Sequence, residues 1–198
     1  SKFICEIHNK NPILFIYNKP GQISYWNPIK DPKKIYNIHC PDETIIDFKF
    51  LPHQTIRLAV LMCKSSGKKF TKVFSFNENL LCFEEISHLG VIELDDPTTS
   101  FLVPLAHGSH ERPVYLTIGT TYLGIVYKTG LVKVDSPFLG SPSLSFYRIK
   151  PFAVMIGTQK GSVYCLSFGQ TLDIHHLGDL PIIPTSITNI DGNIFYFG

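Results

Sequence analysis

The strongest candidate for a chemical site in this sequence is the polar segment GTQKGS (residues 157–162), which follows an apolar run. A phosphate-binding loop needs four residues between its glycines, a lysine after the second glycine, and a helix that begins there. Here three residues separate Gly157 from Gly161, Lys160 precedes the second glycine, and the following SVYCLSF is rich in β-branched and aromatic residues. We therefore predict a tight turn between two strands, with Gly161 at positive φ.

The segment HGSHER (residues 107–112) is the densest polar cluster, and its histidines raise the question of a metal site. Zinc would require two further ligands at motif spacing beside His107 and His110, and no nearby segment supplies them. His175 and His176 are adjacent on an apparent strand, so they point to opposite faces and cannot chelate together. No nucleophile elbow and no paired cysteine–histidine motif is present. We expect a protein that is not an enzyme and that uses no metal or cofactor.

Composition and charge argue against two common classes of partner. Hydrophobic residues make up 44% of the chain, enough for a real core, and the formal net charge is only +2. This balance gives no electrostatic reason to expect nucleic acid or membrane as the main partner. The five scattered cysteines include no CxxC pair, which suits a reducing compartment such as the cytosol or nucleus. Because the sequence begins and ends inside apparent strands, we read it as a fragment of a longer protein.

Strand-like runs follow one another along nearly the whole chain, separated by turn segments such as NKPG, KSSG, YKTG and TQKG. The helix candidate NENLLCFEEISHLG (residues 77–90) is assigned to strand because its surroundings are all β. Residues 58–63 and 152–156 are apolar at successive positions, so both faces of these strands must be covered. Without helices, stacked small sheets such as propeller blades provide that cover.

A repeat supports the propeller interpretation. Gly119 and Gly157 end similar segments 38 residues apart, and Gly198 follows 41 residues later. The turn glycines Gly21 and Gly67 are 46 residues apart. Spacings of about 40 to 50 residues are typical of blades with four strands each. The sequence therefore predicts an all-β fold over residues 1–198, a single partial propeller of about four to five blades of four antiparallel strands.

Two places in the sequence are candidates for protein binding. Trp26 could anchor an interface, since aromatic residues dominate interface hot spots, and packing between blades is the alternative. The loop from Ala106 to Pro113 combines His107, His110 and Arg112 with a flanking proline, and an ordinary solvated loop is the alternative there.

Four passages resemble a known family in their order along the chain. They are TIIDFKFLPHQTIRLAVLMCKSSGKKFTKVFSF, FLVPLAHGSHERPVYLTIGTTYLGIVYKTG, RIKPFAVMIGTQKGSVYCLSF and LGDLPIIPTSITNIDGNIFYFG, which together cover most of residues 45–198. This order is similar to the family of the damaged-DNA-binding protein large subunit and the cleavage-and-polyadenylation factor A. The first forty residues match only as a generic blade, and VDSPFLGSPSLS (residues 134–145) departs from the family pattern, as in a divergent, fungal-type member.

The resemblance implies the first of three seven-bladed propellers in a large nuclear scaffold. Members of the ligase branch are adaptors that link a cullin ubiquitin ligase to substrate receptors, in DNA repair or heterochromatin assembly. The first and third propellers hold the receptor, and the second meets the cullin. The alternative is a branch that scaffolds messenger-RNA 3′-end cleavage or splicing. The implied partners are proteins, with nucleic acid contacted at most indirectly and no membrane. A propeller enzyme is a third class, and only HGSHER offers residues for it.

Overall fold

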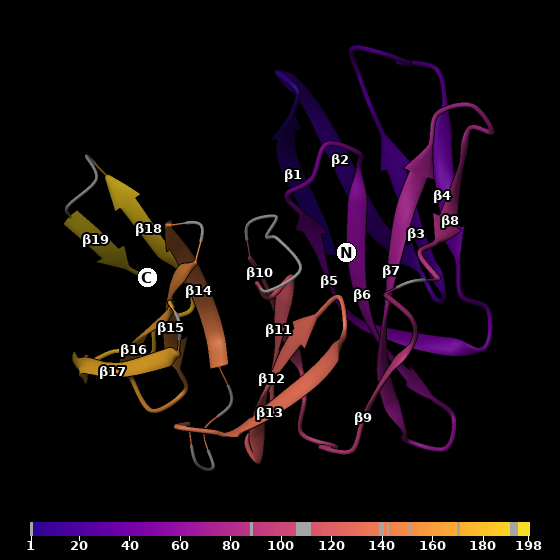
Figure 1. Cartoon of the computed structure of the whole chain (residues 1–198). Helices are drawn as coiled ribbons and strands as arrows, with labels where there is room; N and C mark the ends of the chain where they lie inside the picture. The colour runs from indigo at the N-terminus through magenta and orange to yellow at the C-terminus, as the bar shows by residue number, and fades with distance from the viewer. Residues whose placement is uncertain are drawn as a thin grey trace. The chain divides into compact units, whose positions relative to one another are not determined.

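The computed structural model describes residues 2–87, 89–105, 112–138, 141, 143–150, 152–169, 171–190 and 194–198. All regular secondary structure in these residues is β-strand, which confirms the all-β part of the predicted fold. The chain divides into two compact units, Ser1–Pro97 and Thr98–Gly198 (Figure 1).

The first unit consists of two antiparallel sheets whose strands follow one another in chain order. Sheet 1 has the order β1 (Lys2–His8), β2 (Asn11–Lys19), β3 (Gln22–Trp26), β4 (Ile35–His39). Sheet 2 has the order β5 (Glu43–Leu51), β6 (Arg57–Lys64), β7 (Lys69–Asn77), β8 (Cys82–Glu85), with β9 (Ile92–Leu94) also on β7. The outermost strand of sheet 2 is therefore in two pieces, β8 and β9.

The second unit repeats the same plan. Sheet 3 has the order β10 (Phe101–Pro104), β11 (Tyr115–Ile118), β12 (Tyr122–Tyr127), β13 (Gly130–Asp135). Sheet 4 has the order β14 (Ser143–Lys150), β15 (Ala153–Thr158), β16 (Ser162–Phe168), β17 (Leu172–Asp179). A hairpin of β18 (Ile187–Ile190) and β19 (Ile194–Phe197) completes the unit. Each four-stranded sheet has the consecutive antiparallel order of a propeller blade.

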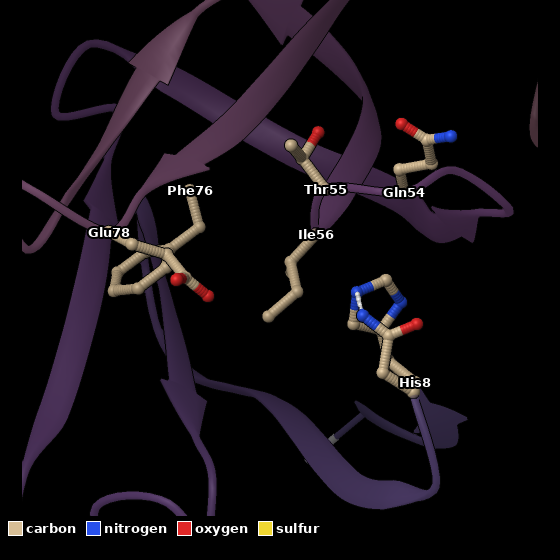
Figure 2. A pocket seen from close by; sticks show the side chains of 7 residues that line it. His8, Gln54, Thr55, Ile56, Phe76 and Glu78 are labelled. Atoms are coloured by element: carbon tan, nitrogen blue, oxygen red, sulfur yellow. Dashed lines mark hydrogen bonds between the residues drawn. The ribbon is translucent and has the colours of Figure 1, made fainter.

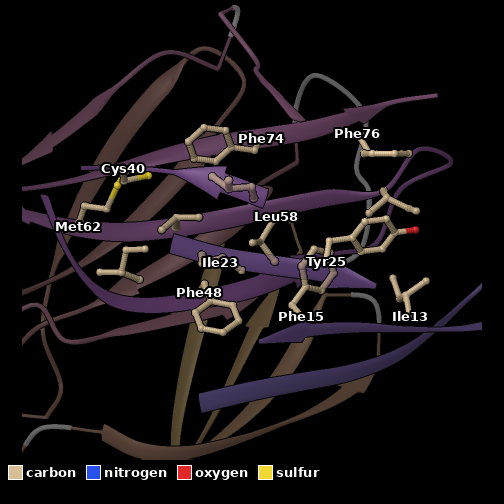
Figure 3. Packing of buried hydrophobic residues seen from close by; sticks show 14 of the residues in the cluster. Ile13, Phe15, Ile23, Tyr25, Cys40, Phe48, Leu58, Met62, Phe74 and Phe76 are labelled. Atoms are coloured by element: carbon tan, nitrogen blue, oxygen red, sulfur yellow. The ribbon is translucent and has the colours of Figure 1, made fainter. Parts of the chain in front are cut away.

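The core of the first unit lies between sheets 1 and 2. Alternate residues of β2 and β3, including Phe15 and Ile23, point to one face of sheet 1 and are fully buried there. They form one cluster with Phe48, Leu58 and other apolar residues of sheet 2 (Figure 3). In β6 the successive residues from Leu58 to Met62 are all buried, so both faces of this strand are covered, as its apolar run predicts.

The core of the second unit joins sheets 3 and 4 in the same way. Leu116 and Ile125 of sheet 3 pack in one cluster with Val154 and Ile156 of sheet 4, both of which are 0% exposed. The opposite face of sheet 4 contacts the hairpin, where Met155 belongs to a cluster with residues of β18 and β19. The predicted burial of Val154 and Ile156 between sheets is confirmed.

The segment GTQKGS is a turn, as its sequence predicts. It connects β15 to β16, and the Gly161 amide donates to the Thr158 carbonyl at 3.0 Å. Gly161 has a φ of 83°, and a Cβ there would lie 2.6 Å from the Leu180 carbonyl oxygen. Glycine is required for both reasons. Gly119 and Gly198 directly follow β11 and β19, so the 41-residue and 38-residue spacings do reflect a repeat of sheets.

The segment NENLLCFEEISHLG contains a turn and the short strand β8, so its assignment to strand is confirmed for residues 82–85. Asn77 begins the turn, and its Oδ1 accepts hydrogen bonds from the amides of Asn79 at 3.0 Å and Leu80 at 3.1 Å. An asparagine that bonds the backbone two and three residues ahead is a common way to begin a turn.

Candidate functional site

The candidate site lies in the first unit, where loops from both sheets meet at one end. These are the connections from β1 to β2, β3 to β4, β5 to β6, and β7 to β8. In each antiparallel sheet, connections that follow odd-numbered strands emerge at the same end. Three hollows contain residues from several of these loops, which places the ends of the two sheets side by side.

The first hollow has a volume of about 260 Å³. It is lined by His8 and Asn9 from the first connection, by Gln54, Thr55 and Ile56 before β6, and by Phe76 and Glu78 at the end of β7. Figure 2 shows Ile56 between His8 on one side and Phe76 with Glu78 on the other. Its lining therefore combines the apolar side chains of Ile56 and Phe76 with polar ones.

The second hollow, of about 190 Å³, is the most aromatic of the three. Tyr25, Tyr36 and Phe76 line it together with Leu81 and with polar residues of the β3–β4 loop. The ring centroids of Tyr36 and Phe76 are 4.9 Å apart, and those of Tyr25 and Phe76 are 5.2 Å apart. These contacts fix the rings in place, because aromatic pairs at such distances are attractive beyond their buried area.

The third hollow is more open, with a volume of about 450 Å³. Thr55, Ser75, Asn77, Asn79 and Glu84 line it with the same Phe76 and Glu78. All three hollows have Phe76 and Glu78 in their linings, so they adjoin one another, and we call them together the rim groove.

Charged groups close one side of the rim groove. Lys30 Nζ donates to Glu78 Oε1 at 2.7 Å, and this exposed ion pair joins the β3–β4 loop to the β7–β8 turn. Tyr36 donates its hydroxyl to Asp31 Oδ2 at 2.6 Å, which raises the pKa of Tyr36 to about 12. Burial raises the pKa of Tyr25 as well. Both tyrosines therefore remain neutral at any physiological pH.

Large apolar side chains stand exposed around the groove. Ile29 and Leu80 are each 65% exposed and Leu81 is 47% exposed. Leu81 also has a φ of 53°, a left-handed backbone that is unfavourable for a bulky residue. A strained, exposed leucine beside a hollow is typical of a functional loop.

Trp26, one of the candidate residues from the sequence, lies close to this end of sheet 1 but outside the rim groove. It is in register with Leu14 of β2 and Ile35 of β4, on the face of sheet 1 opposite the core. Its indole Nε1 donates to the Pro32 carbonyl at 3.2 Å, which ties the β3–β4 loop down. Its role as an interface anchor stays a prediction.

Arg112 is in the second unit, where its guanidinium carbon lies 4.2 Å from the centroid of the Phe152 ring. This is a stacking distance for a cation on an aromatic face, and it ties the β10–β11 connection to the β14–β15 connection. His107 and His110 lie outside the described residues, so their joint role with Arg112 stays a prediction.

A buried charge cluster lies elsewhere in the first unit. Asp47 of β5 is almost completely buried and contacts the ammonium groups of Lys2 and of Lys49, the latter at 2.8 Å. Burial and the neighbouring Lys49 lower the pKa of Lys2 to about 7, and burial lowers the pKa of Lys49 to about 8. The cluster joins β1 to β5 and is a structural contact between the two sheets.

Nothing in the described part of the chain brings three or more His, Cys, Asp or Glu side chains together in a way that could hold a metal ion. The five cysteines are free, and burial raises the pKa of the Cys40 thiol to about 11, which keeps it protonated. The residues that the structure describes also contain no helix long and apolar enough to cross a membrane.

The rim groove is only weakly indicated by the sequence. Its lining comes from four connections that are far apart in the chain, and each contributes ordinary turn residues. The signal that was available is the pair Leu80 and Leu81 in a turn begun by Asn77, since turns are normally polar.

Comparison of the chain with models of protein families finds no family that matches it, and a search of curated proteins finds no similar sequence.

Proposed function

We propose that the chain is a protein-binding module of a β-propeller scaffold, and that it works by presenting loop surfaces to partner proteins. The rim groove carries this proposal. It is built by loops at one end of two packed sheets, while the strands themselves are used in packing. In propellers and other scaffolds, binding residues are found on loops held by a rigid framework.

At a finer level, we propose a place in the first of three seven-bladed propellers of a nuclear cullin-RING ubiquitin ligase adaptor. This part rests on the order of the four family-like passages. The repeated four-stranded sheets are compatible with it, because a blade of this kind is the unit of any propeller. The working partners would then be substrate receptors in DNA repair or heterochromatin assembly, and the cullin would bind another part of the protein.

Co-purification tests the proposal. The tagged protein, captured from nuclear extract of its own organism, should bring down a cullin together with receptor proteins of the WD-propeller type. Recovery of messenger-RNA cleavage or splicing factors instead would assign the protein to the alternative branch. Recovery of neither group, with the protein folded and soluble, would contradict the scaffold proposal.

A variant with His107, His110 and Arg112 replaced by alanine tests the loop predicted from the sequence. Receptor recovery should fall while cullin recovery is unchanged. Because Arg112 stacks on Phe152, a second variant, Arg112→Lys, controls for the lost contact. It keeps the positive charge but removes the planar group that stacks best. Equal recovery of every partner with both variants would exclude this loop from receptor binding.

A further inference from the structure

We propose that the rim groove binds a partner segment that carries an arginine between apolar residues. This inference rests on the proposed function, since it names the chemistry of the partner for the same groove. It is carried by the groove's shape, its aromatic rings, its charge and the exposed apolar side chains around it.

The aromatic rings of the lining can attract a flat cation where they are accessible. Phe76 lines all three hollows, and Tyr25 and Tyr36 pack against it. Phe76 and Tyr25 are only 9% and 2% exposed, so the half-buried Tyr36 is the most accessible of the three rings. Aromatic faces attract cations, and a guanidinium stacks on them better than an ammonium because it is planar and less strongly hydrated. Both tyrosines keep their protons at neutral pH, so these rings carry no charge.

The charge of the lining favours a positive ligand. The groove is lined by three carboxylates, those of Asp31, Glu78 and Glu84, and by one ammonium group, that of Lys30. Asp31 is neutralised by Lys34 at 3.5 Å and accepts the Tyr36 hydroxyl. Glu84 accepts from the neutral amide of Asn77 at 2.8 Å. The lining therefore has a net negative charge, and an arginine is the complement that can also bond a carboxylate with two parallel hydrogen bonds.

Glu78 is the residue that an arginine would contact. It lines all three hollows and is held by Lys30 only through an exposed ion pair. The side chain of Lys30 is 61% exposed and that of Glu78 is 66% exposed. Exposed pairs of this kind contribute little to stability, so exchange of Lys30 for a ligand cation costs little. Once covered by a partner, the new pair would be shielded from water and stronger.

The exposed apolar side chains provide the remaining contact area. Ile29 lies on the β3–β4 side of the groove, and Leu80 and Leu81 lie on the β7–β8 side. Apolar residues on both sides of a ligand arginine would cover them. The strained backbone at Leu81 keeps its side chain at this position, where a relaxed turn residue would be more stable.

Fluorescence anisotropy with the complete chain tests this inference. The probe is a short labelled peptide with one arginine between leucines. Matched peptides replace the arginine by glutamate or the leucines by serine. We expect the arginine peptide to bind at least about tenfold more tightly than the glutamate peptide, and its affinity to fall as salt is raised. Equal or tighter binding of the glutamate peptide would overturn the inference.

The variant Glu78→Gln should bind the arginine peptide about tenfold more weakly than the wild-type protein does. Its matched control is Glu93→Gln, because Glu93 forms a similar exposed pair with Lys68 at 2.6 Å on β9, away from the groove. Equal losses in the two variants would show a general effect of charge and would overturn the assignment to the groove.

A second variant keeps the test valid if Glu78→Gln folds poorly. Leu81→Gly removes an exposed apolar side chain and also relieves the left-handed strain, so it should melt at or above the wild-type temperature. We expect it to bind the arginine peptide several-fold more weakly despite its greater stability. Unchanged binding by this variant would exclude the leucine from the contact. Failure of all peptides while named partners still co-purify would reject the arginine chemistry and leave the scaffold proposal standing.

Discussion

The two faces of sheet 1 are similar in composition, but their large apolar side chains differ in exposure. The inner face, with Ile13, Phe15 and Ile23, is buried against sheet 2. On the outer face Phe3, Ile7 and Ile35 are 68%, 76% and 63% exposed, around the half-buried Trp26. An apolar row of this kind on one sheet face usually marks an interaction surface.

The polar residues of the outer face strengthen this comparison. Asn37 Oδ1 accepts from Gln22 Nε2 at 2.9 Å and from Ser24 Oγ at 2.9 Å, so these side chains already satisfy one another. A polar group that has its hydrogen bond can be covered at little cost, whereas an unpaired one cannot. The outer face is therefore suited to be covered, which the propeller proposal requires of a blade face. The two faces have nearly the same residue types, and they differ because sheet 2 covers only the inner face.

A charge placed on each face should give the largest contrast. Ile23→Asp puts a carboxylate into the fully buried layer and should cost more than about 4 kcal/mol, enough to unfold the first unit. Ile35→Asp, on the exposed face, should change the free energy of unfolding by less than about 1 kcal/mol. Urea unfolding followed by circular dichroism measures both. Similar losses in the two variants would mean that the outer face is covered too.

The buried side also includes a charged contact, and its removal should have the next largest effect. Asp47→Asn keeps the shape but leaves the ammonium groups of Lys2 and Lys49 without the carboxylate that both contact. Breaking a buried pair from one side typically costs about 3 to 5 kcal/mol. The control Glu93→Gln breaks an exposed pair and should cost less than about 1 kcal/mol. A stability equal to that control would show that the Asp47 contact contributes no more than a surface pair.

The same cluster predicts a dependence of stability on pH. The folded pKa values of Lys2 and Lys49, about 7 and about 8, lie below their ordinary value of 10.5. Between these values the unfolded chain binds more protons than the folded chain, so the free energy of unfolding should rise as pH increases from about 7 to about 10.5. Urea midpoints at pH 6.5, 8 and 9.5 measure the trend. In the Lys2→Met variant the free energy of unfolding should rise less steeply with pH. A wild-type urea midpoint that falls over this pH range would contradict the lowered pKa values of Lys2 and Lys49.

The outer face should matter for association and much less for folding. Replacing Phe3, Ile7 and Ile35 together by serine should leave the free energy of unfolding within about 1 kcal/mol of wild type, because these side chains are exposed. Sedimentation velocity should show less self-association in the variant, since apolar surface drives it. If the triple variant aggregates as much as the wild-type protein, the surface responsible for self-association lies elsewhere.

The sequence predicted the inner strands well and the outer ones poorly. Runs such as residues 58–63 and 152–156 are apolar because their strands are buried, and the structure places them in β6 and, from Ala153 onward, in β15. The outer strands β4, β13 and β17 have mostly exposed side chains, so no apolar pattern marks them. Hydrophobic periodicity detects burial, and it fails where a strand is held mainly by backbone hydrogen bonds to one neighbour.

The candidate site was harder to predict for a related reason. Phe76 and Tyr25 look like core residues in the sequence, and they are core residues that also line the groove. Only the packing of two sheets brings the loop of Lys30 beside the turn of Glu78, which lies 48 residues further along the chain. Arg112 was predicted to bind a partner protein; the contact that the structure shows for it is internal, with the Phe152 ring, and the binding role stays a prediction.

The divided outer strand of sheet 2 affects what kind of larger assembly this unit can form. β8 pairs with residues 74–77 of β7 and β9 with residues 69–71, so neither piece offers a long free backbone edge. Fibrils grow when one chain after another adds a strand to such an edge, and short or irregular edge strands prevent that. At this edge, growth by strand addition is therefore blocked. Larger complexes of this unit would therefore form through side-chain contacts, on a sheet face or in the rim groove, and not through this edge.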